Sequence, residues 1–561
     1  MLATEGECKA APQAPGAESA PPFMVYDGPV IPRKPTDGDC IAVSHANRLA
    51  LLALLALLSL ATGCAVNPVT GKSELSLISP EQEIAIGAQQ YQPSQQSQGG
   101  RYYIDPELQN YVAGVGRKLA AVSDRAGLPY EFVVLNNPVP NAWALPGGKI
   151  AINTGLLLHL EDESQLAAVL AHEIVHAAAR HGASQMSRGV LVNVGTQVAG
   201  VAAQSAGYGN LGGIAAQLGG QAWMARYGRD DELESDAYGM DYMKRAGYDP
   251  LGAVELQETF VKLNASRQQD FLSGLFASHP PSQERVNRNR EKAAQLGAGG
   301  LRNRDVYQRR IAQLKRDKPA YDAQTEAIKA LNNKDGKTAI SHLDRAIKLQ
   351  PRDGAFWELR GHAWSMLDEK ARAEQDFSAA ISRNPAYFSH HLARGVLRYE
   401  SGRVREAMPD LEKSHQLLPT TTSAFYLGQN ADAGGDRAKA IGYYQQAAQS
   451  SGALGKKAQS RLVHLEMAET PHKYISSTPY LGDDGRLWLV IRNNSALAVT
   501  GVQVQLGEMV NSFMMGNVTT LPGPSQLGPG QQAVVKTRIA IAERGELAKY
   551  RTQVVAARPA N

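Results

Sequence analysis

The stretch SQLAAVLAHEIVHAAARHG, residues 164–182, contains the pattern His-Glu-x-x-His at His172, Glu173 and His176. Its alanine-rich, apolar composition predicts a buried helix from its first residue to about Arg180. Residues four apart lie on the same face of a helix, so the two imidazoles can close on one metal ion. Glu173 lies to the side of that face, where it can act as general base for a water molecule. The stretch therefore predicts a zinc-binding helix that also supplies a base.

A catalytic zinc ion takes three protein ligands and keeps one position for water or substrate. The acidic cluster RDDELESDAYG, residues 229–239, offers carboxylates and includes Glu232, 56 residues after His176. Glu232 and Asp236 are four residues apart, so they share one face if the cluster is helical. We expect the third ligand to come from this cluster.

These motifs resemble those of the gluzincin metallopeptidases of membranes and periplasm, which include HtpX and the CAAX prenyl proteases. The family pattern is HExxH on one helix and ExxxD on a second. The resemblance extends to NPVTGKSELSLIS at residues 67–79, to NAWALPGGKIAINTGLL at residues 141–157, and to SHPPSQER at residues 278–285. It covers roughly residues 67–290 and is closest to periplasmic BepA-like proteases that carry tetratricopeptide repeats. The fold that it implies for this part of the chain is an α+β zincin-like peptidase domain.

The resemblance implies one Zn²⁺ per chain, held by His172, His176 and Glu232. It also implies that Glu173 and Asp236 are catalytic. Asp236 would orient a ligand histidine or assist proton transfer, and the neighbouring Glu234 would be a spare acid. His181 is expected to be a structural or surface histidine, because the three ligands are already supplied.

His279 lies between an apolar run and two prolines, in the segment LFASHPPSQER. The resemblance places this stiff segment near the zinc cleft. Three roles are open: a turn histidine that caps a backbone group, a donor to the developing oxyanion, or a fourth zinc ligand that keeps the enzyme off. We favour the inhibitory ligand, because an unrestrained protease would damage its host.

The zinc helix is preceded by two segments, Tyr130–Asn137 and Lys149–Leu157, that read as strands. By resemblance, the residues between them form an edge strand and turn, to which a peptide could add as a further strand. Residues 67–128 read as mostly helical. The 37 residues between Arg188 and Arg226 carry no charge but contain many glycines and glutamines. We expect flexible helices that cover the active site rather than a membrane-spanning segment.

Arg48 is followed by 13 apolar residues, 49–61, a length typical of a signal-peptide core and short for a membrane span. Ala61 to Cys64 resembles a bacterial lipoprotein cleavage box, with Ala61 where leucine is usual. An ordinary cleaved signal or a buried helix is the alternative. Residues 1–47 are expected to be a disordered extension or a mis-assigned start.

Of the three cysteines, Cys8 and Cys40 precede the expected cleavage point, so Cys64 would be the only mature thiol. A disulfide is then excluded, and Cys64 is the expected lipidation site. We expect a periplasmic protein that is anchored by lipid. Ala65 favours the outer membrane as its location.

The composition is that of an ordinary globular protein, with 43% hydrophobic and 20% charged residues and a formal net charge of +4. A basic stretch follows Pro281 and includes Arg285, Arg288 and Arg290. Acidic residues are interspersed in it and aromatic residues for base stacking are scarce. We therefore expect a solvated linker helix, in contact with anionic lipid at most, and no nucleic-acid partner.

The next part of the chain repeats with a period of 34 residues. Small, large and turn-forming residues recur at this spacing, as in Ala339, Ala373 and Ala407, in Leu343, Phe377 and Leu411, and in Pro351, Pro385 and Pro419. The pattern resembles tetratricopeptide repeats, an α-solenoid of helix pairs with a concave surface for peptides or partners. A mere spacer is the alternative.

The last 85 residues hold alternating, β-branched runs, which predict a small C-terminal β-sandwich. The expected fold class is thus multidomain and mainly α. The expected divisions are an extension (1–47), a lipoprotein signal (48–63), a zinc metallopeptidase domain (64–317), tetratricopeptide repeats (318–470) and a β-sandwich (475–561).

The sequence thus predicts a lipid-anchored periplasmic zinc metalloendopeptidase that acts on misfolded or unassembled envelope proteins. Its partners would be protein or peptide substrates and, through the repeats, an outer-membrane assembly machine. The competing hypothesis is a chaperone or assembly factor in which the repeats do the work and the peptidase is latent.

Overall fold

The computed structural model describes residues 64–189, 227–265, 275–276, 278–297, 299–509 and 515–560. The expected signal segment and nearly all of the charge-free run lie outside these residues. The chain divides at Gly63, and the description concerns the unit Cys64–Asn561. Within the described ranges, no helix has the length and apolar character needed to cross a membrane.

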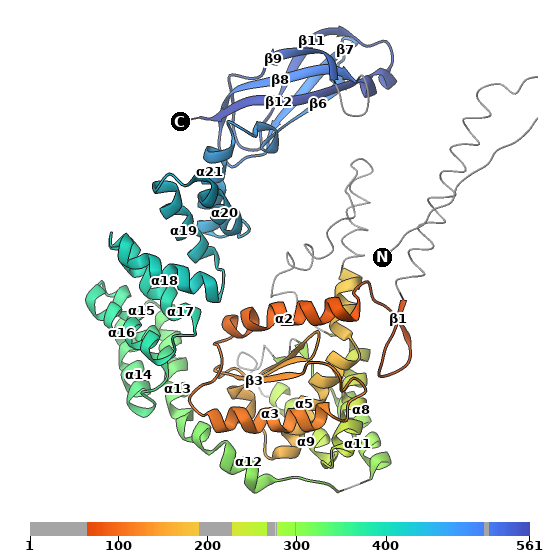
Figure 1. Ribbon diagram of the computed structural model, residues 1–561, viewed down its shortest axis with the longest axis vertical. Helices are drawn as coiled ribbons and strands as arrows, with labels where there is room; N and C mark the ends of the chain where they lie inside the picture. Colours follow the sequence, from red (N-terminus) through yellow and green to blue (C-terminus); the bar gives the residue numbers. More distant parts are fainter. Residues whose placement is uncertain are drawn as a thin grey trace, which may run out of the picture. The chain divides into compact units, whose positions relative to one another are not determined.

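A three-stranded sheet in the order β3-β5-β4 lies at the centre of the N-terminal part. Its strands are β3 (Glu131–Leu135), β4 (Ala142–Leu145) and β5 (Lys149–Asn153), with β3 parallel and β4 antiparallel to β5. Side chains alternate between the two faces of the sheet. One face packs against Tyr91 of α2 (Pro80–Ser97), and the other joins the core formed with α3 (Pro106–Ala120) and α5 (Glu163–Ala178). Figure 1 shows α2 on one side of the sheet and α3 and α5 on the other.

The predicted zinc helix is α5. Asp162 caps its first turn by accepting a hydrogen bond from the backbone N–H of Gln165. The helix ends before Arg180, which has a φ of 65° and whose Nε donates to Glu83 Oε2 on α2 at 2.9 Å. All residues of α5 except His172 are buried. The expectation of a buried helix is confirmed.

The acidic cluster forms α8 (Arg229–Arg245), which packs against α5. A Cβ atom at Gly239 would lie 3.2 Å from the backbone nitrogen of His172. The glycine therefore allows the two helices to approach closely, so that carboxylates on α8 can reach the histidines of α5. Two further helices, α9 (Leu251–Ala265) and α11 (Gln283–Leu296), complete this part of the core.

The predicted strands agree with β3 and β5, but the second prediction runs too far. Residues Thr154–Leu157 form a short helix, α4. The chain leaves the sheet here because Thr154 Oγ1 and the Gly155 N–H both donate to the carbonyl of Asn137. At the other end of β5, Gly147 and Gly148 turn the chain at φ values of 72° and 81°, as the sequence PGG suggests. A small hairpin, β1 (Cys64–Val66) and β2 (Ser73–Leu75), precedes α2.

The repeat region is formed by consecutive helices that pack in pairs. Helix α12 (Arg304–Arg310) comes before them and contacts α3 and α5. The helices of the repeat region are α13 (Ala312–Asn332), α14 (Gly336–Leu349), α15 (Gly354–Met366), α16 (Lys370–Arg383), α17 (Phe388–Glu400), α18 (Val404–Leu417), α19 (Thr421–Ala433), α20 (Arg437–Ala447) and α21 (Ala453–Glu466).

The 34-residue period has a direct packing cause. A Cβ atom at Gly361 would lie 2.5 Å from the ring of Phe377, and one at Gly395 would lie 3.0 Å from the side chain of Leu411. Each glycine on the first helix of a pair thus receives a large side chain from the second. Arg360 binds Asp376 through two hydrogen bonds of 2.8 Å, and an equivalent arginine pair follows 34 residues later.

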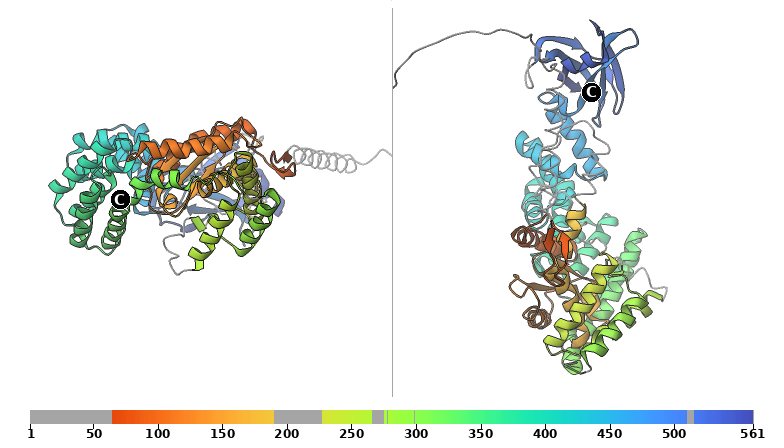
Figure 2. Two further views of the ribbon diagram at one scale, coloured as in Figure 1. Left: turned by 90° about the horizontal axis from the view of Figure 1, so that it is seen from below. Right: turned by 90° about the vertical axis from the view of Figure 1, so that its right-hand side faces the viewer.

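The C-terminal part holds two antiparallel sheets that share one hydrophobic cluster. The first sheet contains β8 (Val499–Met509), β9 (Met515–Pro522), β10 (Gln526–Leu527) and β12 (Tyr550–Pro559). The second contains β6 (Ile475–Leu481), β7 (Arg486–Asn493) and β11 (Gln532–Ala540). The right-hand view of Figure 2 shows these strands, in blue, gathered in one body.

A mainly helical, multidomain chain with some β-sheet is therefore confirmed. The finer assignments to zincin, tetratricopeptide and sandwich folds stay predictions, as do the domain boundaries.

Candidate metal centre

Four side chains from three segments converge beside α5: His172, His176, Glu232 and His279. One ligand atom of each lies within 4.8 Å of the others. The Nε2 atoms of His172 and His176 are 3.1 Å apart, and Glu232 oxygens lie 3.5 and 3.3 Å from them. His279 Nδ1 lies 2.9 Å from Glu232 Oε1 and 3.3 Å from His172 Nε2. Around a tetrahedral zinc ion with bonds of about 2.0–2.2 Å, ligand atoms lie about 3.4 Å apart. The spacing therefore fits zinc.

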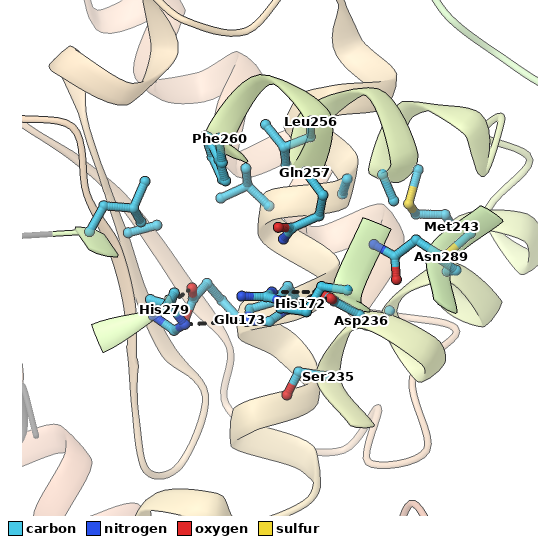
Figure 3. A pocket seen from close by; sticks show the side chains of 18 of the residues that line it. His172, Glu173, Ser235, Asp236, Met243, Leu256, Gln257, Phe260, His279 and Asn289 are labelled. Atoms are coloured by element: carbon cyan, nitrogen blue, oxygen red, sulfur yellow. Dashed lines mark hydrogen bonds and ion pairs between the residues drawn. The ribbon is translucent and has the colours of Figure 1, made fainter. Parts of the chain in front are cut away.

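Outer hydrogen bonds fix which nitrogen of each ring faces the centre. His172 Nδ1 lies 2.9 Å from Asp236 Oδ1 and donates to it, which leaves Nε2 for the ion (Figure 3). The negative charges nearby offset the effect of burial and raise the pKa of His172 to about 10. A proton and a metal ion thus compete for the same Nε2 atom. Burial holds the pKa of His176 well below its usual value, so that ring is neutral.

Arg285 binds two of the carboxylates of α8, those of Asp236 and Glu232. Its Nε and Nη2 donate to Asp236 at 2.7 Å each, and its Nη1 lies 2.7 Å from Glu232 Oε2. All three side chains are buried. Although burial alone would raise the pKa of Asp236, Arg285 and His172 lower it overall. The guanidinium of Arg285 offsets only one of the two negative charges of Asp236 and Glu232. The centre therefore keeps an excess of negative charge, which favours a cation.

Glu173 is 2% exposed, and its Oε2 atom has no hydrogen-bond partner among the described residues. Its other oxygen lies 3.5 Å from His279 Nε2. Burial raises the pKa of Glu173. A buried carboxylate with a free oxygen and a raised pKa is suited to accept a proton from water.

His176 is held by two further groups. Its Nδ1 lies 2.9 Å from Nδ1 of His181, and His181 Nε2 lies 3.2 Å from Glu234 Oε1, which also accepts from Asn67. If His176 donates to His181 and His181 donates to Glu234, both hydrogen bonds are made with one proton on each ring. His176 Nε2 then stays free for the ion. The ring of Tyr227 stacks on His176 with centroids 3.8 Å apart.

Two expectations from the sequence need correction. Arg285 was expected on a solvated linker helix, but it is 4% exposed and binds Asp236 and Glu232, because a basic run also supplies counter-ions to buried acids. His181 was expected to be structural or at the surface. It is 2% exposed and contacts a candidate ligand, so the surface alternative is wrong.

Sequence reasoning also missed Arg285 and Tyr227 as parts of the centre. Arg285 stands six residues after His279, in the segment SHPPSQER that carries the resemblance, and this proximity was the available signal. Tyr227 follows Arg226, which bounds the charge-free run, and the sequence around it carries no motif.

Replacing His181 with alanine is expected to weaken zinc binding by about 10- to 100-fold, because His176 loses the partner that orients its ring. The measurement is zinc affinity by competition with a chromophoric chelator, with circular dichroism to check the fold. His181→Gln should recover part of the affinity through its amide. His464→Ala, an exposed histidine on α21, is the control and should bind zinc like the wild type. Equal zinc affinities of His181→Ala and this control would show that His181 does not orient His176 for the metal.

Comparisons with known proteins agree with this centre. Residues 106–293 match Peptidase family M48. The metalloprotease YcaL of Escherichia coli K12 is 31% identical over 188 residues, which cover 32% of this chain and 70% of that protein. The beta-barrel assembly-enhancing protease of the same strain is 29% identical over 238 residues, which cover 41% of this chain and 47% of that protein.

The mitochondrial metalloendopeptidase OMA1 of Schizosaccharomyces pombe is 34% identical over 182 residues, covering 32% of this chain and 52% of that protein. The chain thus spans about half the length of the assembly-enhancing protease and of OMA1. Among solved structures, the OM64 TPR domain of Arabidopsis is 22% identical to the matched part of this chain. The match covers 21% of this chain and 98% of that domain, with a TM-score of 0.21.

Proposed function

Since the chain belongs to peptidase family M48, we propose that it is a zinc metalloendopeptidase of the bacterial periplasm that acts on misfolded or unassembled envelope proteins. The observation that carries the proposal is the convergence of His172, His176 and Glu232 beside the free oxygen of Glu173. This arrangement combines a metal site with a base, the two parts that metal-assisted peptide hydrolysis uses.

In this mechanism, His172, His176 and Glu232 hold the zinc ion. When bound, zinc supplies Lewis-acid activation of water and of a peptide carbonyl. Glu173 takes the proton of the attacking water and returns it to the leaving amine. Asp236 keeps His172 in the tautomer that presents Nε2, and Arg285 holds Asp236 in place.

Strand β4 is the proposed platform for the substrate backbone. It pairs with β5, is the end strand of the described sheet and contacts α5. An extended peptide that adds to this edge gains main-chain hydrogen bonds without regard to its sequence. Such binding suits a protease whose substrates share an unfolded state rather than a sequence.

His279 is proposed as a regulatory fourth ligand. Its Nδ1 lies at ligand spacing from both Glu232 and His172, and its Nε2 faces Glu173. A ring in this place occupies the position that a catalytic site leaves open for water or substrate. The protease would then stay latent until a substrate or partner moves the segment around His279.

We also propose that Cys64 carries lipid that anchors the protein, at the outer membrane, and that the helical repeats hold substrates or an outer-membrane assembly machine. The repeat packing of α13 to α20 supports the second part, because such arrays usually present binding surfaces. The competing function is a chaperone or assembly factor with a silent peptidase, which the same repeats would serve.

The test uses the full chain with Glu173→Gln as a substrate trap in envelope extracts. We expect envelope proteins to remain bound intact, zinc to be retained, and Cys64→Ala to release the protein from membranes. Mass spectrometry identifies both the trapped proteins and the modification of Cys64. If the wild type holds the same proteins intact and does not cleave them, the result would instead support the chaperone.

A further inference from the structure

A pocket opens directly beside the metal ligands, between α5, α8, α9 and α11 (Figure 3). His172, Glu173 and His279 form its catalytic side. Its walls are apolar and come from four segments, with side chains that include Val169, Met240, Met243, Leu256, Phe260 and Leu275. A cavity in this place is where a substrate side chain next to the scissile bond would lie.

Two amides interrupt the apolar lining. Gln257 on α9 is 5% exposed and Asn289 on α11 is 1% exposed. Gln257 Oε1 and Asn289 Nδ2 have no hydrogen-bond partner within the described part of the chain. Figure 3 shows Gln257 reaching from α9 toward His172, with Asn289 on the other side of the pocket beside Met243. Buried polar atoms are seldom left unpaired, and an unpaired one within a pocket indicates a bound partner.

The charged groups in the pocket lining have other roles. Asp236 and Arg285 are bound to each other through two hydrogen bonds, and Glu173 is the proposed base. Apart from Glu173, a charged substrate side chain would therefore find no free counter-ion in the lining. A purely apolar side chain would match the walls but leave both amides unpaired, which is costly in a buried site.

We propose that this pocket selects a substrate side chain that ends in a carboxamide, glutamine foremost. Its methylene groups contact the apolar walls, its N–H donates to Gln257 Oε1, and its carbonyl accepts from Asn289 Nδ2. A carboxamide carries two donors and an acceptor, so it satisfies both pocket amides at once. The inference rests on the proposed peptidase function and adds a specificity to it.

The first experiment maps the cleavage sites of the zinc-loaded full chain in reduced, unfolded casein by mass spectrometry. Glutamine or asparagine is expected at one fixed position relative to the cut bond, about tenfold above its abundance, as two neutral hydrogen bonds would give. In Gln257→Leu and in Asn289→Leu, cleavage at these sites falls and the same position shifts toward leucine and methionine. Gln295→Leu, an exposed position on α11, is the matched control and keeps the wild-type pattern.

The second experiment does not depend on activity. N-acetylglutamine N-methylamide at millimolar concentration should raise the Tm of the Glu173→Gln protein more than the leucine analogue does, and Gln257→Leu should remove this difference. Cleavage without a carboxamide preference, or with a preference that survives in both leucine variants, would overturn the proposed specificity of the pocket. The proposed peptidase function would still stand. A Tm difference without any cleavage by the wild type overturns the peptidase and leaves the pocket. If the two analogues shift the Tm equally, the amides hold only a structural water.

Discussion

Replacing Glu173 with glutamine is expected to lower the cleavage of an unfolded protein by about 100- to 10,000-fold, the usual contribution of a general base. Glutamine has nearly the same shape but cannot accept a proton from water. The zinc content should stay at the wild-type value, because Glu173 is outside the group of four candidate ligands. The measurement is the initial rate of casein cleavage, with zinc determined by mass spectrometry on the same samples.

The control is Glu291→Gln, the same change at an exposed position on α11. It should cleave at the wild-type rate. If Glu173→Gln also cleaves at that rate, Glu173 is not the base and the assigned mechanism is wrong.

Replacing His279 with alanine is expected to raise proteolysis, or self-cleavage, by about 10-fold or more without loss of zinc. If the open form is a minor state of about 0.1–10% of molecules, removing the blocking ring makes it the dominant one. His172, His176 and Glu232 still hold the ion, so zinc stays bound. The measurement compares casein cleavage and the rate at which the purified chain degrades itself.

The sign of this change separates the three roles of His279. A fall on the order of a hundredfold would show that the ring donates to the developing oxyanion instead. No change in either direction would leave a histidine that only stabilises its turn. His464→Ala, far along the chain on α21, serves as the control for effects of removing any imidazole.

Much of the metal centre could be predicted from the sequence because its main groups come from two helices. The spacing of His172 and His176, and of Glu232 and Asp236, follows from 3.6 residues per turn and needs no knowledge of the tertiary fold. The structure adds that Gly239 brings the two helices together. The role of each residue stays a prediction until the variants are measured.

Other parts of the centre could not be predicted, because they depend on contacts between segments far apart in the chain. Arg285 lies in a run of basic residues and differs from its neighbours only in its buried partners on α8. Gln257 and Asn289 follow no motif, and only the packing of α9 and α11 brings both to one pocket. In the repeats, by contrast, the 34-residue period predicted the helix pairs, because the residues that recur belong to local contacts within a pair, such as that of Gly361 with Phe377.

The central claim is that one zinc ion at His172, His176 and Glu232 makes this chain a peptidase. The most direct measurement titrates zinc into the chelator-stripped full chain and follows bound metal and casein cleavage together. We expect cleavage to rise in proportion to zinc and to level off at about one ion per chain. Glu232→Ala should show neither tight binding nor cleavage. Undiminished cleavage by the metal-free protein, or by Glu232→Ala, would contradict the claim.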